Sequence, residues 1–190
     1  MADVRGVATS PRIDPDRYRD VLGRFVTGIT VVTTMANEDG QPRPFGTTVN
    51  AFNSVSLDPP LVLITIGQER SIHPVIGKAG RFAVNILAED GQELSDCFSG
   101  APSIHPRQAF CDAAYRVSEE GMPLLDEALA WIDCELERTI EAGDHTIYLG
   151  RIVDLGVTDR ERWPLLYYRR RYLRIERAAS ADLLGKPDAT

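Results

Sequence analysis

The first periodic stretch of the chain predicts an amphipathic helix. Asp14 can cap this helix and Pro15 suits its first turn. Apolar residues then recur at the i, i+3, i+4, i+7 spacing that aligns them on one helix face: Tyr18, Val21, Leu22 and Phe25. Gly28 is expected to end the helix, because a β-branched run, ITVVTT, follows it directly.

From that run onward the pattern is typical of short strands. Extended segments are predicted at 29–34, 45–52, 61–66, 81–87, 165–168 and 172–175. Short helices are predicted after Ser71, through Ile76, and after Asp90, which forms a capping-box pattern with Glu93. Residues 99–114 resemble a loop. Regular helices between the strands are missing, so the sequence favours a mainly β, antiparallel barrel with helical additions over a doubly wound parallel sheet.

The clearest pattern is the alternation between Ala130 and Glu141. The even positions are mostly apolar and the odd positions mostly acidic, including Asp133, Glu135 and Glu137, which predicts a long strand with one solvent-facing side. Ala142-Gly143-Asp144 is a turn, and residues 145–155 return as the second strand of a hairpin. The row of carboxylates is interpreted as a solvated strand face rather than as an acid–base pair.

Length and charge narrow the class of protein. The chain of 190 residues predicts one domain, at 14–176, with tails at 1–13 and 177–190. Its formal net charge of −7 disfavours nucleic acid and anionic membranes as partners. No apolar run is long enough for a membrane span, and the first residues do not resemble a secretory signal. We therefore expect a cytoplasmic protein.

The spacing of the cysteines and histidines indicates neither a metal site nor a disulfide framework. The three cysteines, Cys97, Cys111 and Cys134, form no C-x-x-C pair, and the three histidines, His73, His105 and His145, have no ligand-like spacing. A disulfide framework and a metal site are both predicted to be absent. Cys134 is interpreted as a small buried hydrophobic residue.

The stretch from Gly46 to Pro60 is the most unusual part of the chain. It carries hydroxyl and amide side chains with no charge before Asp58, namely Thr47, Thr48, Asn50, Asn53, Ser54 and Ser56. Such groups suit a phosphate and the polar edge of a planar heterocycle. Composition alone favours a strand end that satisfies its own turns.

As a string, G-x-T-x-N-x-F-x-S-V-S-L-D-P-P resembles the flavin-binding segment of the flavin reductase-like proteins, the reductase components of two-component monooxygenases. RFVTGITVVTT, RFAVNIL, the GDHTI hairpin and PLLYYRRRYLRI follow in the order usual for that family. The resemblance covers about residues 14–176. It implies an FMN-binding split β-barrel with a leading helix and short peripheral helices, usually a homodimer, that uses NADH or NADPH to reduce FMN or FAD.

The resemblance also implies site residues. The flavin would be lined by Thr48, Asn50, Ala51, Ser54, Val55 and Ser56, with Ser54 and Ser56 near the ribityl phosphate, Ser71 reaching the phosphate, and Phe82, Ala83 and Asn85 on a strand passing near the flavin. Arg169 is the candidate for a pyrophosphate or flavin-tail contact. The chain departs from the family at Ala51, where many relatives carry Ser, and in the run of arginines at 169–171.

His145 opens the second strand of the hairpin, and the resemblance implies that it receives the nicotinamide cofactor. Its imidazole can hydrogen-bond to a carboxamide or a phosphate. The alternative is a histidine that only ties the turn of the hairpin.

The predicted function is that of an NAD(P)H:flavin oxidoreductase, with no catalytic side chain because the two cofactors carry the hydride chemistry. No G-x-G-x-x-G fingerprint is present, so a Rossmann domain is not predicted to hold the nicotinamide. Reduced flavin would serve a partner monooxygenase. Two alternatives stay open: a flavin carrier or sensor without turnover, and a reductase that uses tightly bound FMN on another acceptor. The sequence does not choose FMN over FAD or NADH over NADPH.

Overall fold

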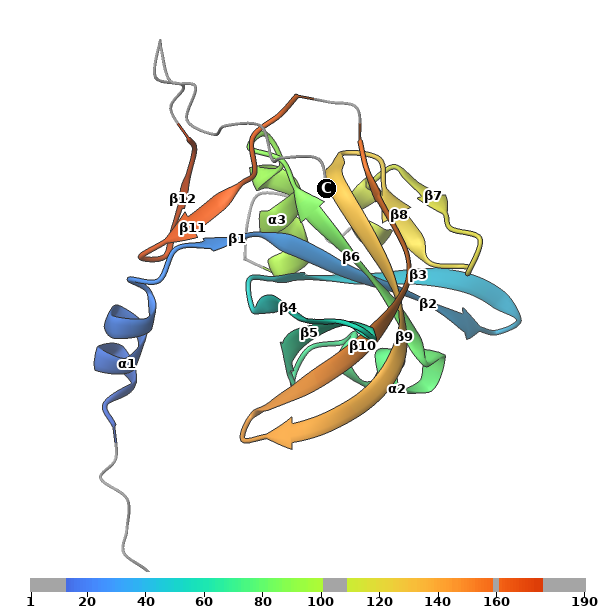
Figure 1. The fold of residues 1–190 in the computed structure, drawn as a ribbon, viewed down its shortest axis with the longest axis horizontal. Coiled ribbons are helices and arrows are strands. Elements are labelled where there is room, and N and C mark those ends of the chain that lie inside the picture. The colour runs from blue at the N-terminus through green and yellow to red at the C-terminus, as the bar shows by residue number, and fades with distance from the viewer. Residues whose placement is uncertain (1–12, 101–108, 159–160, 176–190) are drawn as a thin grey trace, which may run out of the picture.

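Seven antiparallel strands curl into a barrel at the centre of the molecule (Figure 1). The computed structural model describes residues 13–100, 109–158 and 161–175. The predicted tails lie outside these ranges except for Ile13, as does His105. The order across the sheet is β3 (Gln41–Val49), β2 (Thr30–Glu38), β6 (Arg81–Leu87), β9 (Ala128–Ala142), β10 (His145–Val157), β5 (Pro60–Gly67) and β4 (Phe52–Leu57). The predicted antiparallel barrel is confirmed.

Smaller elements surround the barrel. A second sheet has the order β1 (Thr27–Gly28), β11 (Leu166–Tyr168), β12 (Arg171–Leu173), and a third pairs β7 (Tyr115–Val117) with β8 (Pro123–Leu125). The helices are α1 (Pro15–Leu22), α2 (His73–Ala79), α3 (Gln92–Ser99) and the short 3₁₀ helix η1 (Ala109–Asp112). None of the helices in the described ranges is long and apolar enough to cross a membrane. Figure 1 shows α1 standing away from the barrel.

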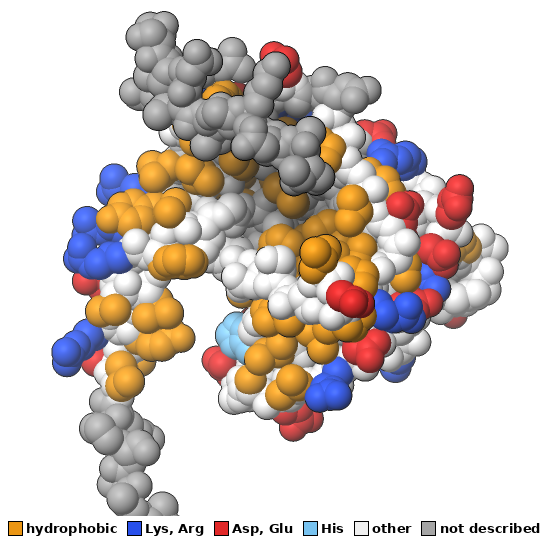
Figure 2. Space-filling model, viewed as in Figure 1, with side chains coloured by type: hydrophobic (Ala, Val, Ile, Leu, Met, Phe, Trp, Pro, Cys, Tyr) orange, Lys and Arg blue, Asp and Glu red, His pale blue; other side chains and the backbone are white. Residues whose placement is uncertain are grey.

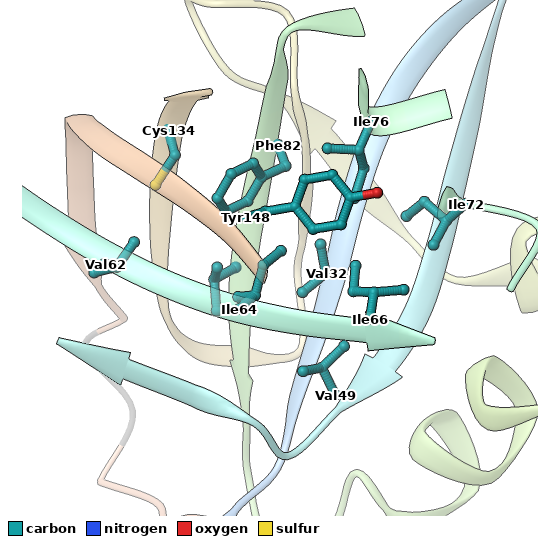
Figure 3. Close-up of a cluster of buried hydrophobic side chains, with 11 residues drawn as sticks. Val32, Val49, Val62, Ile64, Ile66, Ile72, Ile76, Phe82, Cys134 and Tyr148 are labelled. Carbon is teal, nitrogen blue, oxygen red and sulfur yellow. The ribbon is translucent and has the colours of Figure 1, made fainter. Parts of the chain in front are cut away.

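The main core fills the barrel and is covered at one end by α2. Figure 3 shows the ring of Tyr148 lying among Phe82, Ile72 and Ile76, which come from β6 and from α2 with the residue before it. Phe82, Ile72 and Ile76 have no exposed surface, and Tyr148 is 2% exposed. Because a fully buried aromatic ring contributes much of a core's apolar area, Tyr148 on β10 and Phe82 on β6 are major parts of this core.

The leading helix is shorter than its apolar stripe predicts. The Asp14 carboxylate accepts a hydrogen bond from the Arg17 backbone N–H at 2.9 Å, which confirms the predicted cap. The helix ends at Leu22, and its C-cap is Gly23. This C-cap lies five residues before Gly28, where the sequence pattern predicts the end. No side chain of α1 is buried, so no tertiary contact within the chain extends the helix along its apolar face.

The caps predicted for the two inner helices are wrong. Ile72, not Ser71, is the N-cap of α2, and Gly91, not Asp90, is the N-cap of α3. Asp90 instead accepts hydrogen bonds from the Arg162 guanidinium at 2.9 and 3.1 Å. That ion pair joins residues far apart in the sequence, and local patterns do not reveal it.

The solvent-facing side predicted for β9 is wrong at Asp133. The small hairpin of β7 and β8, which the sequence pattern did not indicate, covers this residue and leaves it 0% exposed. Ser118 donates a hydrogen bond to one carboxylate oxygen of Asp133, while the other oxygen is buried without a partner among the described residues. Burial raises the pKa of the Asp133 carboxyl, and the Ser118 hydrogen bond opposes that shift.

The predicted absence of a disulfide is also wrong, because Cys97 is bonded to Cys111. The bond joins the last turn of α3 to η1, where the rings of Phe98 and Phe110 meet edge to face at 5.1 Å. Tertiary packing of these two segments creates the pairing, so the sequence spacing of the cysteines does not show it. Cys134 is buried and unpaired, as predicted.

Two glycine substitutions are expected to change stability in opposite directions. A Cβ at Gly150 on β10 would lie 2.5 Å from the buried ring of Phe82 and 2.9 Å from the Cβ of Cys134. Gly150→Ala should therefore lower the free energy of unfolding by about 1–3 kcal/mol. A Cβ at Gly77, inside α2, meets nothing within 4 Å, so Gly77→Ala should raise it by about 0.5–1 kcal/mol. Denaturant unfolding at one protein concentration measures both, and equal effects would contradict this account of the core.

Candidate functional site

The polar stretch lies where the chain crosses from one edge of the barrel sheet to the other. β3 and β4 are the two edge strands, and only Asn50 and Ala51 separate them in the sequence. The Thr65 backbone N–H donates to the Ala51 carbonyl at 3.0 Å, which ties the crossing to β5. No described residues of β3 and β4 pair with each other, so the barrel closes here without a continuous hydrogen-bond ladder.

The strand β4 presents hydrogen-bonding groups that the fold does not use. Asn50, Asn53 and Ser54 are exposed and Ser56 is half-buried, and within the described structure none of their side chains makes a hydrogen bond. Because β4 has a strand neighbour on one side only, a row of its backbone groups is also free. A register shift between Ser54 and Ser56 makes Val55 a bulge, which redirects the neighbouring side chains.

Two further segments predicted from the sequence lie at the end of β5 that adjoins the crossing. Arg70 N–H bonds back to the Gly67 carbonyl at 3.0 Å, so the turn carrying Ser71 stays close to the strand end. His145 pairs with Gly67 across the sheet, and the Gln68 N–H donates to the Asp144 carbonyl at 3.0 Å. The structure thus gathers the crossing, the exposed Ser71 turn and the His145 hairpin at one end of the barrel.

His145 has a defined tautomer when it is neutral. Its Nδ1 lies 2.8 Å from the Asp144 carboxylate, and this hydrogen bond holds the pKa of Asp144 below its usual range. Because an ionised carboxylate only accepts, Nδ1 carries the proton, and Nε2 of the neutral ring is an acceptor. The side chain is 46% exposed, so Nε2 is available to a ligand.

His73 is a neighbouring residue that the sequence analysis did not assign to the site. Its Nε2 is 2.9 Å from the Thr146 hydroxyl, and its carbonyl accepts from the Tyr148 hydroxyl at 3.1 Å. Both contacts fix the start of β10, at positions one and three residues beyond His145. They join positions more than 70 residues apart, and local sequence patterns contain no signal of them.

Thr48 is tied to α3, which limits what it can offer a ligand. Its hydroxyl donates to the Ser95 carbonyl at 2.6 Å, so a ligand finds only an acceptor there. The fully buried Ser95 hydroxyl bonds to the Tyr172 hydroxyl at 3.0 Å, which donates to Asp96 at 2.8 Å. Burial is the main cause that raises the pKa of Tyr172 to about 12. This network anchors β12 and β3 on the same helix.

Four predicted residues do not face this site. Phe82, Ala83 and Asn85 are 0% exposed. Asn85 donates to the Val31 carbonyl and accepts from the Leu125 N–H at 2.8 Å, so its amide holds strands together. These three side chains therefore have no exposed surface that could contact a flavin, even if their strand passes near it.

Arg169, the fourth residue, lies beside α1. Its N–H donates to the Gly23 carbonyl at 2.8 Å, and its guanidinium is 3.9 Å from Asp20. The structure thus places Arg169 beside α1, and its contact with a flavin tail stays a prediction.

The serines predicted to reach one phosphate lie at opposite ends of β5. Ser56 pairs with Leu61 at the start of the strand, whereas the Ser71 turn follows Gly67 at its end. Six residues of strand separate these points, or roughly 20 Å at about 3.3 Å per residue. One phosphate cannot touch both serines, although a molecule as long as a flavin nucleotide can.

The residues present fit a flavin. Its ring has a polar edge with donors and acceptors, which matches the unused amide, hydroxyl and backbone groups of β4. Its phosphate needs donors and positive charge, which the Ser71 hydroxyl and the adjacent Arg70 guanidinium provide. Among the described residues no group of His, Cys, Asp and Glu is arranged to hold a metal ion.

Comparison with known proteins identifies the relationship. Residues 22–176 match the flavin reductase like domain. The chain belongs to this family. The match covers most of the chain and includes the crossing, the Ser71 turn and the His145 hairpin.

Relatives within the family agree with the fold. The chain is 38% identical to the reductase subunit of a flavin-dependent monooxygenase of Rhodococcus jostii, over 90% of this chain and 83% of that protein. It is 40% identical to a probable flavin reductase of Rhizobium meliloti, over 76% of this chain but only 44% of that longer protein. The solved NADH:FAD oxidoreductase of Streptomyces globisporus, in complex with NAD and FAD fragments, superposes with a TM-score of 0.76 at 33% identity, over 90% of this chain and all of that one.

Proposed function

We propose that this chain is an NAD(P)H-dependent flavin reductase that transfers a hydride from NADH or NADPH to FMN or FAD. The observation that carries the proposal is the meeting of the crossing, the Ser71 turn and the His145 hairpin at one end of the barrel, with polar groups that the fold leaves unused. The Streptomyces relative, an NADH:FAD oxidoreductase, supports the same assignment.

The flavin phosphate belongs at the Ser71 turn, and the polar edge of the ring belongs along β4. Arg70 brings a guanidinium to the Ser71 end, where Glu69 pairs with it at 3.3 Å. In contrast, β4 has no cationic side chain and is followed directly by Asp58, which would repel a phosphate there. The earlier assignment of Ser54 and Ser56 to the phosphate is therefore revised, and both serines serve the ring and ribityl chain.

Flavin and nicotinamide supply the hydride chemistry between them. The protein binds and orients the two molecules, and no side chain needs to act as acid or base in that step. With Nδ1 held by Asp144, the neutral His145 ring accepts a hydrogen bond at Nε2 from the carboxamide N–H of the nicotinamide. His73 positions His145 by fixing the next residue of β10.

Reduced flavin then passes to a separate monooxygenase. The Rhodococcus relative is the reductase subunit of such an enzyme, which supports this partner for the present chain. We place the protein in the cytoplasm, where reduced nicotinamide nucleotides are regenerated.

A second copy of the chain covers the apolar face of α1. Tyr18, Val21 and Leu22 are each more than half exposed, and on the barrel Leu57 and Val157 are 90% and 80% exposed. Figure 2 shows hydrophobic side chains on α1 and on the barrel across the open space beside it. Apolar surface of this extent marks an interaction site, and a two-fold dimer covers both parts at once.

Flavin binding tests where the phosphate lies. Ser71→Ala should weaken FMN binding about tenfold, because a hydroxyl partner of a charged phosphate is lost, and should leave riboflavin binding unchanged. The double variant Ser54→Ala, Ser56→Ala should weaken FMN and riboflavin by the same factor, about tenfold or more. Titration of flavin fluorescence measures each affinity. If the double variant lost affinity for FMN alone, the phosphate would lie on β4 and the proposed orientation would be reversed.

Steady-state NADH oxidation tests the reaction and His145 together. The wild type should consume many equivalents of NADH with FMN or FAD, whereas a carrier would stop after one. His145→Ala should lower kcat/KM for NADH about ten- to a hundredfold with FMN affinity and melting temperature nearly unchanged.

His73→Ala is the comparison variant for stability, because it breaks the Thr146 contact, keeps the His145 imidazole and should cost about 1–2 kcal/mol of stability. Wild-type kinetics in a destabilised His145→Ala variant would assign that histidine to the hairpin turn instead.

Light scattering at micromolar concentration tests the dimer. The wild type should have twice the mass of one chain, and Leu22→Glu should shift it toward the monomer because a charge would enter the covered apolar surface. Arg17→Glu changes the charge of the same helix at an exposed position and should leave the dimer intact. A monomeric wild type would refute the proposed assembly.

A further inference from the structure

The Cys97–Cys111 disulfide lies at the point where α3 holds two segments of the flavin site. The Ser95 carbonyl, two residues before Cys97, accepts the Thr48 hydroxyl from the end of β3. The Ser99 carbonyl, two residues after it, accepts the Arg70 guanidinium from the Ser71 turn. The last turn of α3 therefore connects both sides of the proposed flavin site, and the disulfide fixes that turn to η1.

Packing around the disulfide reaches β3 as well. The ring of Phe98, next to Cys97, lies against Gly46, where a Cβ would approach it to 2.5 Å. Gly46 is two residues before Thr48 on the same strand. A shift of the last turn of α3 consequently changes the contacts of β3 where it enters the crossing.

The backbone on the other side of the bond adopts a costly conformation. Phe110, Cys111 and Asp112 have φ values of 54°, 57° and 50°, in the left-handed region that residues with a side chain seldom occupy. Three consecutive residues persist there only when their surroundings hold them. The covalent bond from Cys111 to α3 is one such restraint, beside the ring contacts of Phe110 with Phe98 and Tyr115, so breaking it removes part of what holds η1.

We propose that Cys97 and Cys111 form a reversible thiol–disulfide switch that hydrogen peroxide closes, and that the closed form binds flavin more tightly. The inference rests on the proposed function, which explains why a reversible bond would be placed beside this site. In a reducing compartment, disulfides are typically transient and redox-sensing.

The oxidation balances without a further co-reactant. One cysteine thiolate attacks a peroxide oxygen, the O–O bond breaks, and a sulfenic acid and a water are formed. The second sulfur then displaces the sulfenic oxygen as another water while the S–S bond forms. Two thiols and one hydrogen peroxide thus give one disulfide and two waters, and the peroxide gains the two electrons that the thiols lose.

A flavin reductase has a direct source of this oxidant. Reduced flavin that escapes its partner enzyme gives two electrons and two protons to dioxygen, which yields hydrogen peroxide and oxidised flavin. When the disulfide closes, α3 holds the flavin segments more firmly and releases less reduced flavin. The device therefore limits peroxide formation by the enzyme that causes it.

The third cysteine is a built-in control. Cys134 is 0% exposed in the barrel core, and burial raises the pKa of its thiol to about 12, so its reactive thiolate is scarce. Cys97 and Cys111 are only partly buried, which leaves them accessible to a small oxidant.

Thiol counting and FMN titration of the full chain test the switch. In denaturant, the oxidised protein should show one free thiol and the reduced protein three, and one equivalent of hydrogen peroxide should restore the first value. The dissociation constant for FMN, measured by fluorescence under anaerobic conditions, should be at least about fivefold lower for the oxidised form. Non-reducing electrophoresis should show the bond within single chains.

Two variants test which cysteines are responsible for the change in FMN affinity. Cys97→Ser with Cys111→Ser should bind FMN like the reduced wild type and show no response to peroxide, whereas Cys134→Ala should keep the full response. Equal FMN affinity in the two redox forms of the wild type would overturn the inference while leaving the proposed function intact. A bond between chains would overturn it as well. Absence of FMN binding in either form would refute the proposed function and the switch with it.

Discussion

The closure of the barrel between β3 and β4 is the constraint on which the rest of the structure depends. The chain passes from one edge strand to the other through only Asn50 and Ala51, and the two edges share a core without sharing a hydrogen-bond ladder. Buried backbone groups must be paired, so an unpaired edge can survive only where it reaches solvent or a ligand. The same gap that splits the barrel therefore leaves hydrogen-bonding groups available. Binding capacity here is a direct product of how the sheet closes.

Much of this arrangement was predictable because its signals are local. The alternation of β9, the turn at Gly143 and the unusual polar stretch follow from neighbouring residues, and the resemblance to the flavin reductases added the roles of Ser71 and His145. The hairpin and the buried state of Cys134 are confirmed, and the roles of Ser71 and His145 stay predictions. The hairpin and the burial of Cys134 follow from patterns of neighbouring residues, whereas the roles of Ser71 and His145 rest on the resemblance.

The errors have a common physical origin in long-range packing. Asp133 looks solvent-facing until β7 and β8 cover it, and Cys97 looks unpaired until η1 folds against α3. The resemblance implies that the strand 81–87 passes near the flavin; its neighbouring strands and the core bury Phe82, Ala83 and Asn85, and that role stays a prediction. His73 contributes through contacts that no local pattern encodes. Contacts with residues far away in the sequence determine the burial and partners of such residues, so the adjacent sequence could not predict their roles.

If a second copy of the chain covers α1, as proposed, the exposed state of this helix makes the behaviour of the protein depend on its concentration. A helix of eight residues without a buried side chain is not stable by itself in water. Its helical form must draw on whatever covers it, and by mass action a cover supplied by another molecule is lost on dilution. The helix α1 would then unfold before the barrel does. In the proposed dimer, specific activity, thermal midpoint and susceptibility of α1 to proteases should consequently all change as the protein is diluted, although no covalent bond or buried contact within the barrel has altered.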